Sequence, residues 1–191
     1  MGSRPPLVVV FGVLVVGLLL LVIGWSIAAY NRLVRLRTRA TASWAQIDVQ
    51  LKRRHSLIPN LVETVKGYAA HERGTLEAVV TARGAAASAH GPAPQAAAEG
   101  ALTQALGRLF ALAEAYPELK ADENFRALQA TLGDTEDKIA YARQFYNNAV
   151  QIYNGAVWSI PTNLVAGVAG FRPEPYFEAA GEERQDVQVR F

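Results

Sequence analysis

Residues 7–29 read LVVVFGVLVVGLLLLVIGWSIAA, and no charged residue lies within them. About twenty apolar residues are enough for an α-helix to cross a hydrocarbon layer roughly 30 Å thick. Trp25 and Tyr30 lie near the C-terminal end of the stretch, where amphipathic rings settle among lipid headgroups. The stretch therefore predicts a transmembrane helix over residues 7–29, preceded by a short extracytoplasmic N-terminus of residues 1–6.

Basic residues lie almost entirely on the C-terminal side of this span. Only Arg4 precedes it, whereas four arginines follow closely: Arg32, Arg35, Arg37 and Arg39. The side with more Lys and Arg near the span stays in the cytoplasm. We therefore expect a single-pass membrane protein, with the N-terminus outside and the larger domain in the cytoplasm. The same four arginines are candidates for binding anionic headgroups, at about 1 kcal/mol each, although setting the topology is a sufficient role for them.

Two other interpretations of the N-terminus fit the sequence less well. A cleaved signal peptide is favoured by the small residues at 26–28 (SIA), but the charged leader is poor and the apolar stretch is too long. N-terminal myristoylation begins correctly at Gly2 but has Pro6 where the motif requires Ser or Thr. We therefore expect the apolar helix to remain as the membrane anchor.

The 191-residue chain contains no cysteine, which excludes disulfides, thiolate nucleophiles and Cys-ligated metal sites. Its formal net charge of +2 divides unevenly. Residues 32–54 carry seven Lys or Arg and one Asp, whereas residues 55–191 carry eleven Lys or Arg and sixteen Asp or Glu. The basic charge therefore lies beside the membrane, which favours membrane lipids as partners and does not favour nucleic acid.

Beyond the span, apolar residues recur at intervals of three and four, the period of an α-helix with one buried face. The two longest stripes are Trp44, Ile47, Leu51, Ile58, Leu61, Val65 and Tyr68, then Phe125, Leu128, Leu132, Ile139, Ala142, Tyr146, Ala149 and Tyr153. The alternation typical of strands does not occur before Pro161. The pattern predicts an all-α fold, in which a transmembrane helix is followed by an antiparallel up-and-down helical bundle over residues 30–160.

Proline and glycine indicate where helices should end. Pro59 predicts a kink or a break, with Ser56 as the N-cap of the next helix. The Gly- and Ala-rich residues 84–100 predict a frayed helix end and a loop. Pro161 should end the longest helix, which Gly133 could divide.

Residues 161–191 form a C-terminal extension, which we expect to pack on the bundle or on the membrane surface. Residues 160–171 are apolar and rich in Gly, Ala, Pro and Asn, whereas the tail beyond them is acidic. A loose terminus is the simplest expectation for this tail. The alternative is a short strand over residues 185–191, formed if a partner offers a sheet edge.

The reactive motifs of helical bundles do not occur in this sequence. His55, His71 and His90 lack the Glu three places earlier that di-iron bundles use. Thr75 stands where a zinc-protease motif starting at His71 needs its second histidine. Phosphate loops, dinucleotide fingerprints and nucleophile elbows do not occur either. We therefore expect no catalytic residue, no metal site and no cofactor.

Polar residues beside the apolar stripes are the remaining candidates for a site. A buried polar group must find a partner or cost about 1–3 kcal/mol. We expect an inter-helix hydrogen-bond network that sets the register of the bundle, with a polar groove for a partner as the alternative. The candidate members are Asp48, Gln50, Asn60, Glu63, Asn124, Asn147 and Asn154.

Short motifs, in order along the chain, resemble the bacterial LemA family. They are residues 30–34 (YNRLV), 44–54 (WAQIDVQLKRR), 57–68 (LIPNLVETVKGY), 114–121 (EAYPELKA), 124–125 (NF), 135–139 (TEDKI), 143–147 (RQFYN), 153–154 (YN), 163–166 (NLVA) and 170–171 (GF). The resemblance extends over residues 30–191, whereas the membrane span matches only in kind.

The resemblance implies a helical bundle on one N-terminal helix of the bacterial cytoplasmic (inner) membrane, with the N-terminus outside and the bundle in the cytoplasm, but no agreed activity and no agreed site. We therefore expect a non-enzymatic scaffold or assembly protein. It would act as a homo-oligomer or recruit membrane proteins such as a membrane metalloprotease. The alternative is a membrane-remodelling protein that binds anionic lipid through the four arginines. An enzymatic or ligand-binding bundle is a third class.

Overall fold

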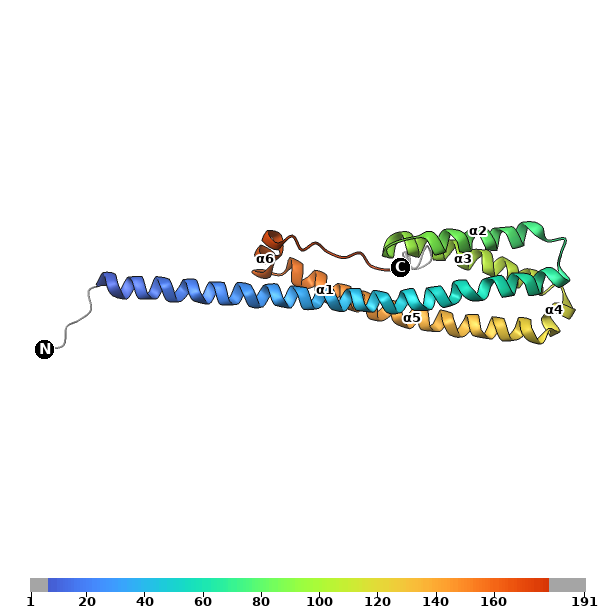
Figure 1. The fold of residues 1–191 in the computed structure, drawn as a ribbon, viewed down its shortest axis with the longest axis horizontal. Coiled ribbons are helices and arrows are strands. Elements are labelled where there is room, and N and C mark those ends of the chain that lie inside the picture. Colours follow the sequence, from blue (N-terminus) through green and yellow to red (C-terminus); the bar gives the residue numbers. More distant parts are fainter. Residues whose placement is uncertain (1–6, 179–191) are drawn as a thin grey trace, which may run out of the picture. The chain divides into compact units, whose positions relative to one another are not determined.

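The computed structural model describes residues 7–178, and within them it has six helices and no strand (Figure 1). The helices are α1 (Leu7–Tyr68), α2 (Arg73–Ser88), α3 (Pro92–Ala113), α4 (Pro117–Ala121), α5 (Glu123–Trp158) and α6 (Thr162–Ala169). The predicted all-α fold is confirmed. Residues 1–6 and 179–191, including the alternative strand at 185–191, lie outside the described residues.

The chain divides into two compact units. The anchor unit comprises residues 1–40 and 149–174, and the bundle unit comprises residues 41–148 and 175–191. Each unit has its own buried apolar core. α1 and α5 pass through both units, so each of these helices contributes to both cores.

The bundle unit is an antiparallel helical bundle, as predicted. Trp44 of α1 contacts Tyr146 of α5, with ring centroids 5.3 Å apart. At the other end of the pair, the Tyr68 hydroxyl donates to Asp122 Oδ2 at 3.0 Å. Rising residue numbers on α1 therefore meet falling numbers on α5, while α2 and α3 form a hairpin (Figure 1). The core side chains include Ile58, Leu61, Val65, Val79, Leu102, Leu109, Leu119 and Phe125.

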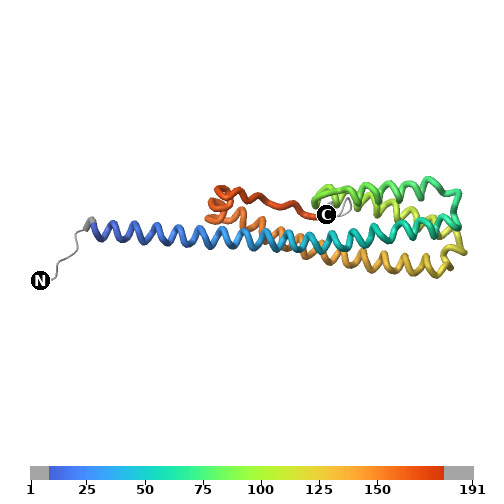
Figure 2. Tube along the Cα trace, in the orientation of Figure 1, coloured from blue at the N-terminus to red at the C-terminus, as the bar shows by residue number. Residues whose placement is uncertain are grey.

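Pro59 does not interrupt α1, so the break predicted there is wrong (Figure 2). A proline has no N–H to donate to the carbonyl four residues earlier, which here belongs to His55. Arg83 of α2 supplies the missing donor, because its Nε lies 2.8 Å from the His55 carbonyl oxygen. Ser56 lies inside α1, where its hydroxyl donates to the Arg53 carbonyl at 2.8 Å, so it is not the predicted N-cap.

The Gly- and Ala-rich residues 84–100 are mostly helical, so the loop predicted there is wrong. Only residues 89–91 lie outside α2 and α3. Alanine has the highest helix propensity, so an Ala-rich run remains helical when other helices cover it. The chain turns at Gly91, whose φ of 87° suits glycine, and Pro92 then begins α3. Gly133 leaves α5 undivided.

Asp122 caps the N-terminus of α5. Its Oδ1 accepts the Phe125 N–H at 2.8 Å. This bond lowers the pKa of Asp122, and the bond from the Tyr68 hydroxyl lowers it further. The same contact raises the pKa of Tyr68, because its proton is shared with a carboxylate. The cap is therefore charged at neutral pH, which suits the positive end of the helix dipole.

The anchor unit contains the first part of α1, the end of α5 and α6. Leu33, Tyr153 and Ala166, one from each helix, are buried together in its core. α6 ends at Gly170, whose φ of 74° is the left-handed conformation common at helix C-termini. The core therefore holds α6 against α1 within this unit.

From Val9 to Ala28 the side chains of α1 are exposed, apart from the half-buried Ser26. It is long and apolar enough to cross a membrane, and none of its most apolar window is buried. Exposed apolar surface costs about 25 cal/mol per Å² in water. A hydrocarbon layer removes this cost, which agrees with the membrane span predicted over residues 7–29.

Replacing Arg83 with Met should leave the His55 carbonyl without a donor and lower the free energy of unfolding by about 1–3 kcal/mol. The loss should be smaller in a Pro59→Ala background, because the new amide N–H can bond the His55 carbonyl itself. Urea unfolding of the detergent-solubilised protein, followed by far-UV circular dichroism, measures both losses. Equal losses in the two backgrounds would show that Arg83 does not compensate for the proline.

Candidate functional site

A carboxylate, a guanidinium and an imidazole meet inside the bundle unit. Arg54 and His55 of α1 and Glu99 of α3 are 4%, 8% and 6% exposed. Arg54 Nη1 lies 3.0 Å from Glu99 Oε2, and His55 Nε2 lies 2.7 Å from Glu99 Oε1. Gln95 Nε2 donates to the same Oε1 at 3.0 Å. We call Arg54, His55, Gln95 and Glu99 the buried polar cluster.

The buried polar cluster connects four helices of the bundle unit. Arg54 Nη2 donates to Thr103 Oγ1 at 2.8 Å and lies 3.3 Å from Glu136 Oε2 of α5. Gln95 Nε2 also donates to the Ala86 carbonyl of α2 at 2.9 Å. Contacts from α1, α2, α3 and α5 therefore converge on a few side chains. Such an arrangement disfavours any sliding of one helix along another, because sliding would leave buried groups unpaired.

This cluster has the chemistry of a structural core. Both oxygens of Glu99 already accept bonds from the chain's own donors. A general acid or base, in contrast, must reach the atom whose proton it transfers. Within residues 7–178, no group of three or more His, Cys, Asp or Glu side chains is arranged to hold a metal ion. This arrangement of paired donors and acceptors therefore has a structural role in the bundle unit.

Sequence reasoning missed the buried polar cluster, although part of its signal is present. Arg54 and His55 lie three and four residues after Leu51 and just before Ile58, so they share the core-facing stripe of α1. Basic residues that follow a membrane span are readily explained as setting its orientation. That explanation draws attention away from the position of Arg54 on the buried face of α1. Glu99 falls in the Ala-rich stretch for which the sequence predicts a loop.

Several of the predicted polar residues lie at the surface of the bundle unit. Asp48 pairs with Lys52 at 2.6 Å, one turn further along α1. Asn60, Glu63 and Asn124 are exposed. Surface pairs and exposed amides contribute little to stability.

Asn154 holds the backbone that follows α6 in the anchor unit. Its side-chain amide exchanges two hydrogen bonds with the backbone of Glu174, each 2.9 Å long. The neighbouring Tyr153 hydroxyl donates to the Arg172 carbonyl at 2.9 Å. Burial raises the pKa of Tyr153, which keeps the hydroxyl protonated as a donor. The side chains of Tyr153 and Asn154 therefore supply hydrogen bonds to the backbone after α6 that a neighbouring strand would otherwise supply.

Asn147 repeats this arrangement in the bundle unit, one heptad earlier on α5. Its amide exchanges two bonds with the Phe177 backbone, at 3.1 and 2.9 Å. The neighbouring Tyr146 hydroxyl donates to the Pro175 carbonyl at 2.7 Å. Phe177 is buried and meets Trp44 edge to face, with ring centroids 5.3 Å apart. Asn147 and Asn154 therefore each fasten backbone, and they do so in separate units.

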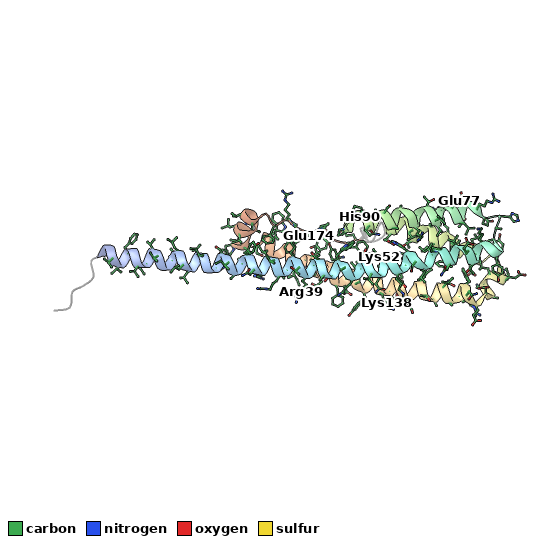
Figure 3. All side chains as sticks on the ribbon, in the orientation of Figure 1. Arg39, Lys52, Glu77, His90, Lys138 and Glu174 are labelled. Atoms are coloured by element: carbon green, nitrogen blue, oxygen red, sulfur yellow. The ribbon has the colours of Figure 1, made fainter. Side chains whose placement is uncertain are left out.

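The four juxtamembrane arginines are all exposed on α1. Arg37 Nε lies 3.2 Å from Glu174 Oε1, so its charge is partly compensated inside the anchor unit. Figure 3 labels Arg39 and Glu174 in this unit. Arg32 and Arg35 follow the apolar span most closely, and their exposure suits contact with lipid headgroups.

An open groove of about 710 Å³ lies between α1 and α5 in the bundle unit. Val49 and Tyr141 on its walls are 60% and 65% exposed, which is high for side chains of this kind. Lys138, labelled in Figure 3, adds a charge on α5. We call this feature the α1–α5 groove, and its lining residues are Gln46, Val49, Gln50, Asp134, Asp137, Lys138, Tyr141 and Ala142.

Gln50, another of the predicted polar residues, lies in the wall of the α1–α5 groove. Its Oε1 is shielded from solvent and meets no donor among the described residues. An unpaired buried acceptor costs about 1–3 kcal/mol. The groove thus combines exposed apolar area with charges of both signs.

Comparisons with known proteins give one consistent result. The profile of the LemA family matches residues 43–191. The chain is 28% identical over 175 residues to the magnetosome proteins MamQ 1 and MamQ 2 of Paramagnetospirillum magneticum. It is also 28% identical over 174 residues to the magnetosome protein MamQ of Magnetospirillum gryphiswaldense. Each match covers 78% of this chain and 64% of the relative, so the chain spans less than two thirds of these relatives' length.

Glu99→Ala should lower the free energy of unfolding by about 3–5 kcal/mol, because Arg54 then lies buried without its closest counter-ion. The matched control is Glu114→Ala, which removes an exposed carboxylate paired with Lys120. That control should lose less than about 1 kcal/mol. Urea unfolding measures the free energy of unfolding of both variants. Similar losses of this free energy in the two variants would contradict the structural role of Glu99.

Asn147→Ala should loosen the backbone around Phe177, because it removes both bonds that hold that residue. The matched control is Asn148→Ala, whose side chain is exposed. Hydrogen exchange at the Phe177 amide should become about fivefold faster in the first variant, in line with the roughly 1 kcal/mol of a typical hydrogen bond. Equal exchange in the two variants would show that Asn147 does not fasten this segment.

Proposed function

Because the chain belongs to the LemA family, we propose that it is a non-enzymatic scaffold anchored in the bacterial cytoplasmic membrane. In this proposal α1 crosses the membrane with the N-terminus outside, and the bundle unit self-associates in the cytoplasm. The excess of arginine after the span supports this orientation. The relatives, which are named as magnetosome proteins, support a membrane-associated, non-enzymatic role.

The observation that carries the proposal is the α1–α5 groove. Val49 and Tyr141 leave apolar surface in water, and a bound protein surface would remove it. Tyr141 and Phe145 also form a tilted ring pair with centroids 4.6 Å apart, and both rings are exposed. Aromatic side chains of this kind often anchor protein interfaces. The groove therefore has the composition of an interface.

The partner that we propose for this surface is a second copy of this chain, which would contact it with the equivalent surface of its own α1 and α5. The groove carries Asp134 and Asp137 beside Lys138. A two-fold axis brings the same patch of each copy together, so Lys138 of one copy can pair with the aspartates of the other. Recruitment of another membrane protein, such as a metalloprotease, is the second way in which this scaffold would use the same groove.

Val49→Lys should weaken self-association at least about tenfold, because it places a charge in the apolar part of the groove. The matched control is Val80→Lys, which changes an exposed valine on α2 outside this groove. Crosslinking in native membranes and single-molecule counting in bilayers measure the oligomeric state. A wild-type protein recovered only as a monomer, or equal association of the two variants, would overturn the proposal.

Membrane remodelling is the second candidate function, and the exposed arginines favour it. Arg32 and Arg35 lie directly beyond the apolar span, where each contributes about 1 kcal/mol of attraction to anionic lipid. This function needs lipid binding to change membrane shape, whereas the scaffold needs contact between protein chains. Vesicle shape and oligomeric state therefore distinguish the two.

A further inference from the structure

The end of α5 and the helix α6 present apolar side chains outward from the anchor unit. Ile160 and Val168 are 85% and 94% exposed, and Trp158 and Leu164 are exposed as well. Ile160, Leu164 and Val168 follow each other at intervals of four, so the last two lie on one face of α6. No charged residue occurs between Arg143 and Arg172. This surface therefore lacks the charged groups that normally face water.

We propose that α6 and the turn before it form a second membrane contact, lying on the inner leaflet with Ile160, Leu164 and Val168 inserted among the lipids. This proposal rests on the proposed insertion of α1 in the membrane, and it does not depend on the proposed self-association through the α1–α5 groove. It assigns lipid to a surface that neither the buried polar cluster nor the α1–α5 groove includes.

The position of α6 along α1 supports this proposal. Tyr30 meets Phe171, which follows α6, with ring centroids 5.5 Å apart. Leu33 packs in one core with Ala166 of α6. At 1.5 Å per residue, Leu33 lies about 6 Å beyond the end of the apolar span. Interfacial helices bury their apolar faces about 5–10 Å into the boundary between headgroups and acyl chains. The anchor unit therefore holds α6 at the depth of the headgroups.

The composition of this surface favours lipid over a soluble protein partner. Trp158 is exposed at the end of α5, and tryptophan is enriched where membrane meets water. Arg32 and Arg35 lie at the same level of α1, where they can neutralise anionic headgroups. Phe171 packs against the unit's core and its neighbour Gly170 ends α6, so the large exposed apolar side chains of this surface extend from Trp158 to Val168.

Single cysteines provide the test, because the chain has none of its own. Full-length Leu164→Cys and Val168→Cys proteins would carry a nitroxide label in nanodiscs of phosphatidylcholine and phosphatidylglycerol, with one copy in each disc. The matched controls are Leu18→Cys within the apolar span and Val80→Cys on the bundle unit, both at exposed positions. Electron paramagnetic resonance then compares collisions with oxygen, which concentrates in lipid, and with a water-soluble nickel chelate.

Labels at Leu164 and Val168 should have an oxygen-to-nickel collision ratio several-fold above that of Val80 and approaching that of Leu18. Because all four side chains are exposed, the labels should not disturb folding, and circular dichroism checks this. A ratio at both positions equal to that of Val80 would overturn the proposal. A raised oxygen-to-nickel ratio that appears only when a disc holds two copies would also overturn the proposal, since a second chain would then cover α6. Either result would leave the test of the α1–α5 groove unaffected.

Discussion

Glu99 carries a carboxylate into the interior of the bundle unit, and this charge has to be compensated for the helices to pack. Arg54 and His55 supply the compensation from α1, and Gln95 supplies it from the same helix as Glu99. A hydrophobic core alone restricts sliding less strictly, because apolar side chains can repack when their total volume and pattern are kept. A buried ion pair does not tolerate it, since displaced partners stay desolvated and unpaired. The register of α1 against α3 therefore follows from this one acceptor.

The same requirement, that buried polar groups be paired, explains the other irregular features. Pro59 frees a carbonyl in the middle of α1, and Arg83 of a neighbouring helix bonds it. The segment after α6 has no partner strand, and Asn147 and Asn154 each pair with its backbone instead. In each case a side chain from one element forms a hydrogen bond with a backbone group of another element that has no backbone partner. A helix or an extended segment can therefore continue where local rules alone would end it.

The proposed functions rest on apolar surfaces that no other part of the described chain covers. The apolar part of α1 is exposed and long enough to cross a membrane. Exposed apolar side chains of α6 belong to the same unit, and the α1–α5 groove combines charges of both signs with exposed apolar area. The proposed membrane contacts and the proposed self-association use these surfaces.

The sequence by itself determined the all-α class, an N-terminal helix apolar enough to span a membrane, the long helix α5 that ends before Pro161, and the family. Apolar periodicity, charge near the span and motif order are local properties, so they can be read along the chain. Only the tertiary structure decided that α1 continues through Pro59, that residues 84–100 are mostly helical and that Arg54 and Glu99 meet inside the bundle. Each of these depends on a donor, an acceptor or a covering face that another helix provides. Such partners are far apart in sequence, and a local pattern contains no information about which of them will meet.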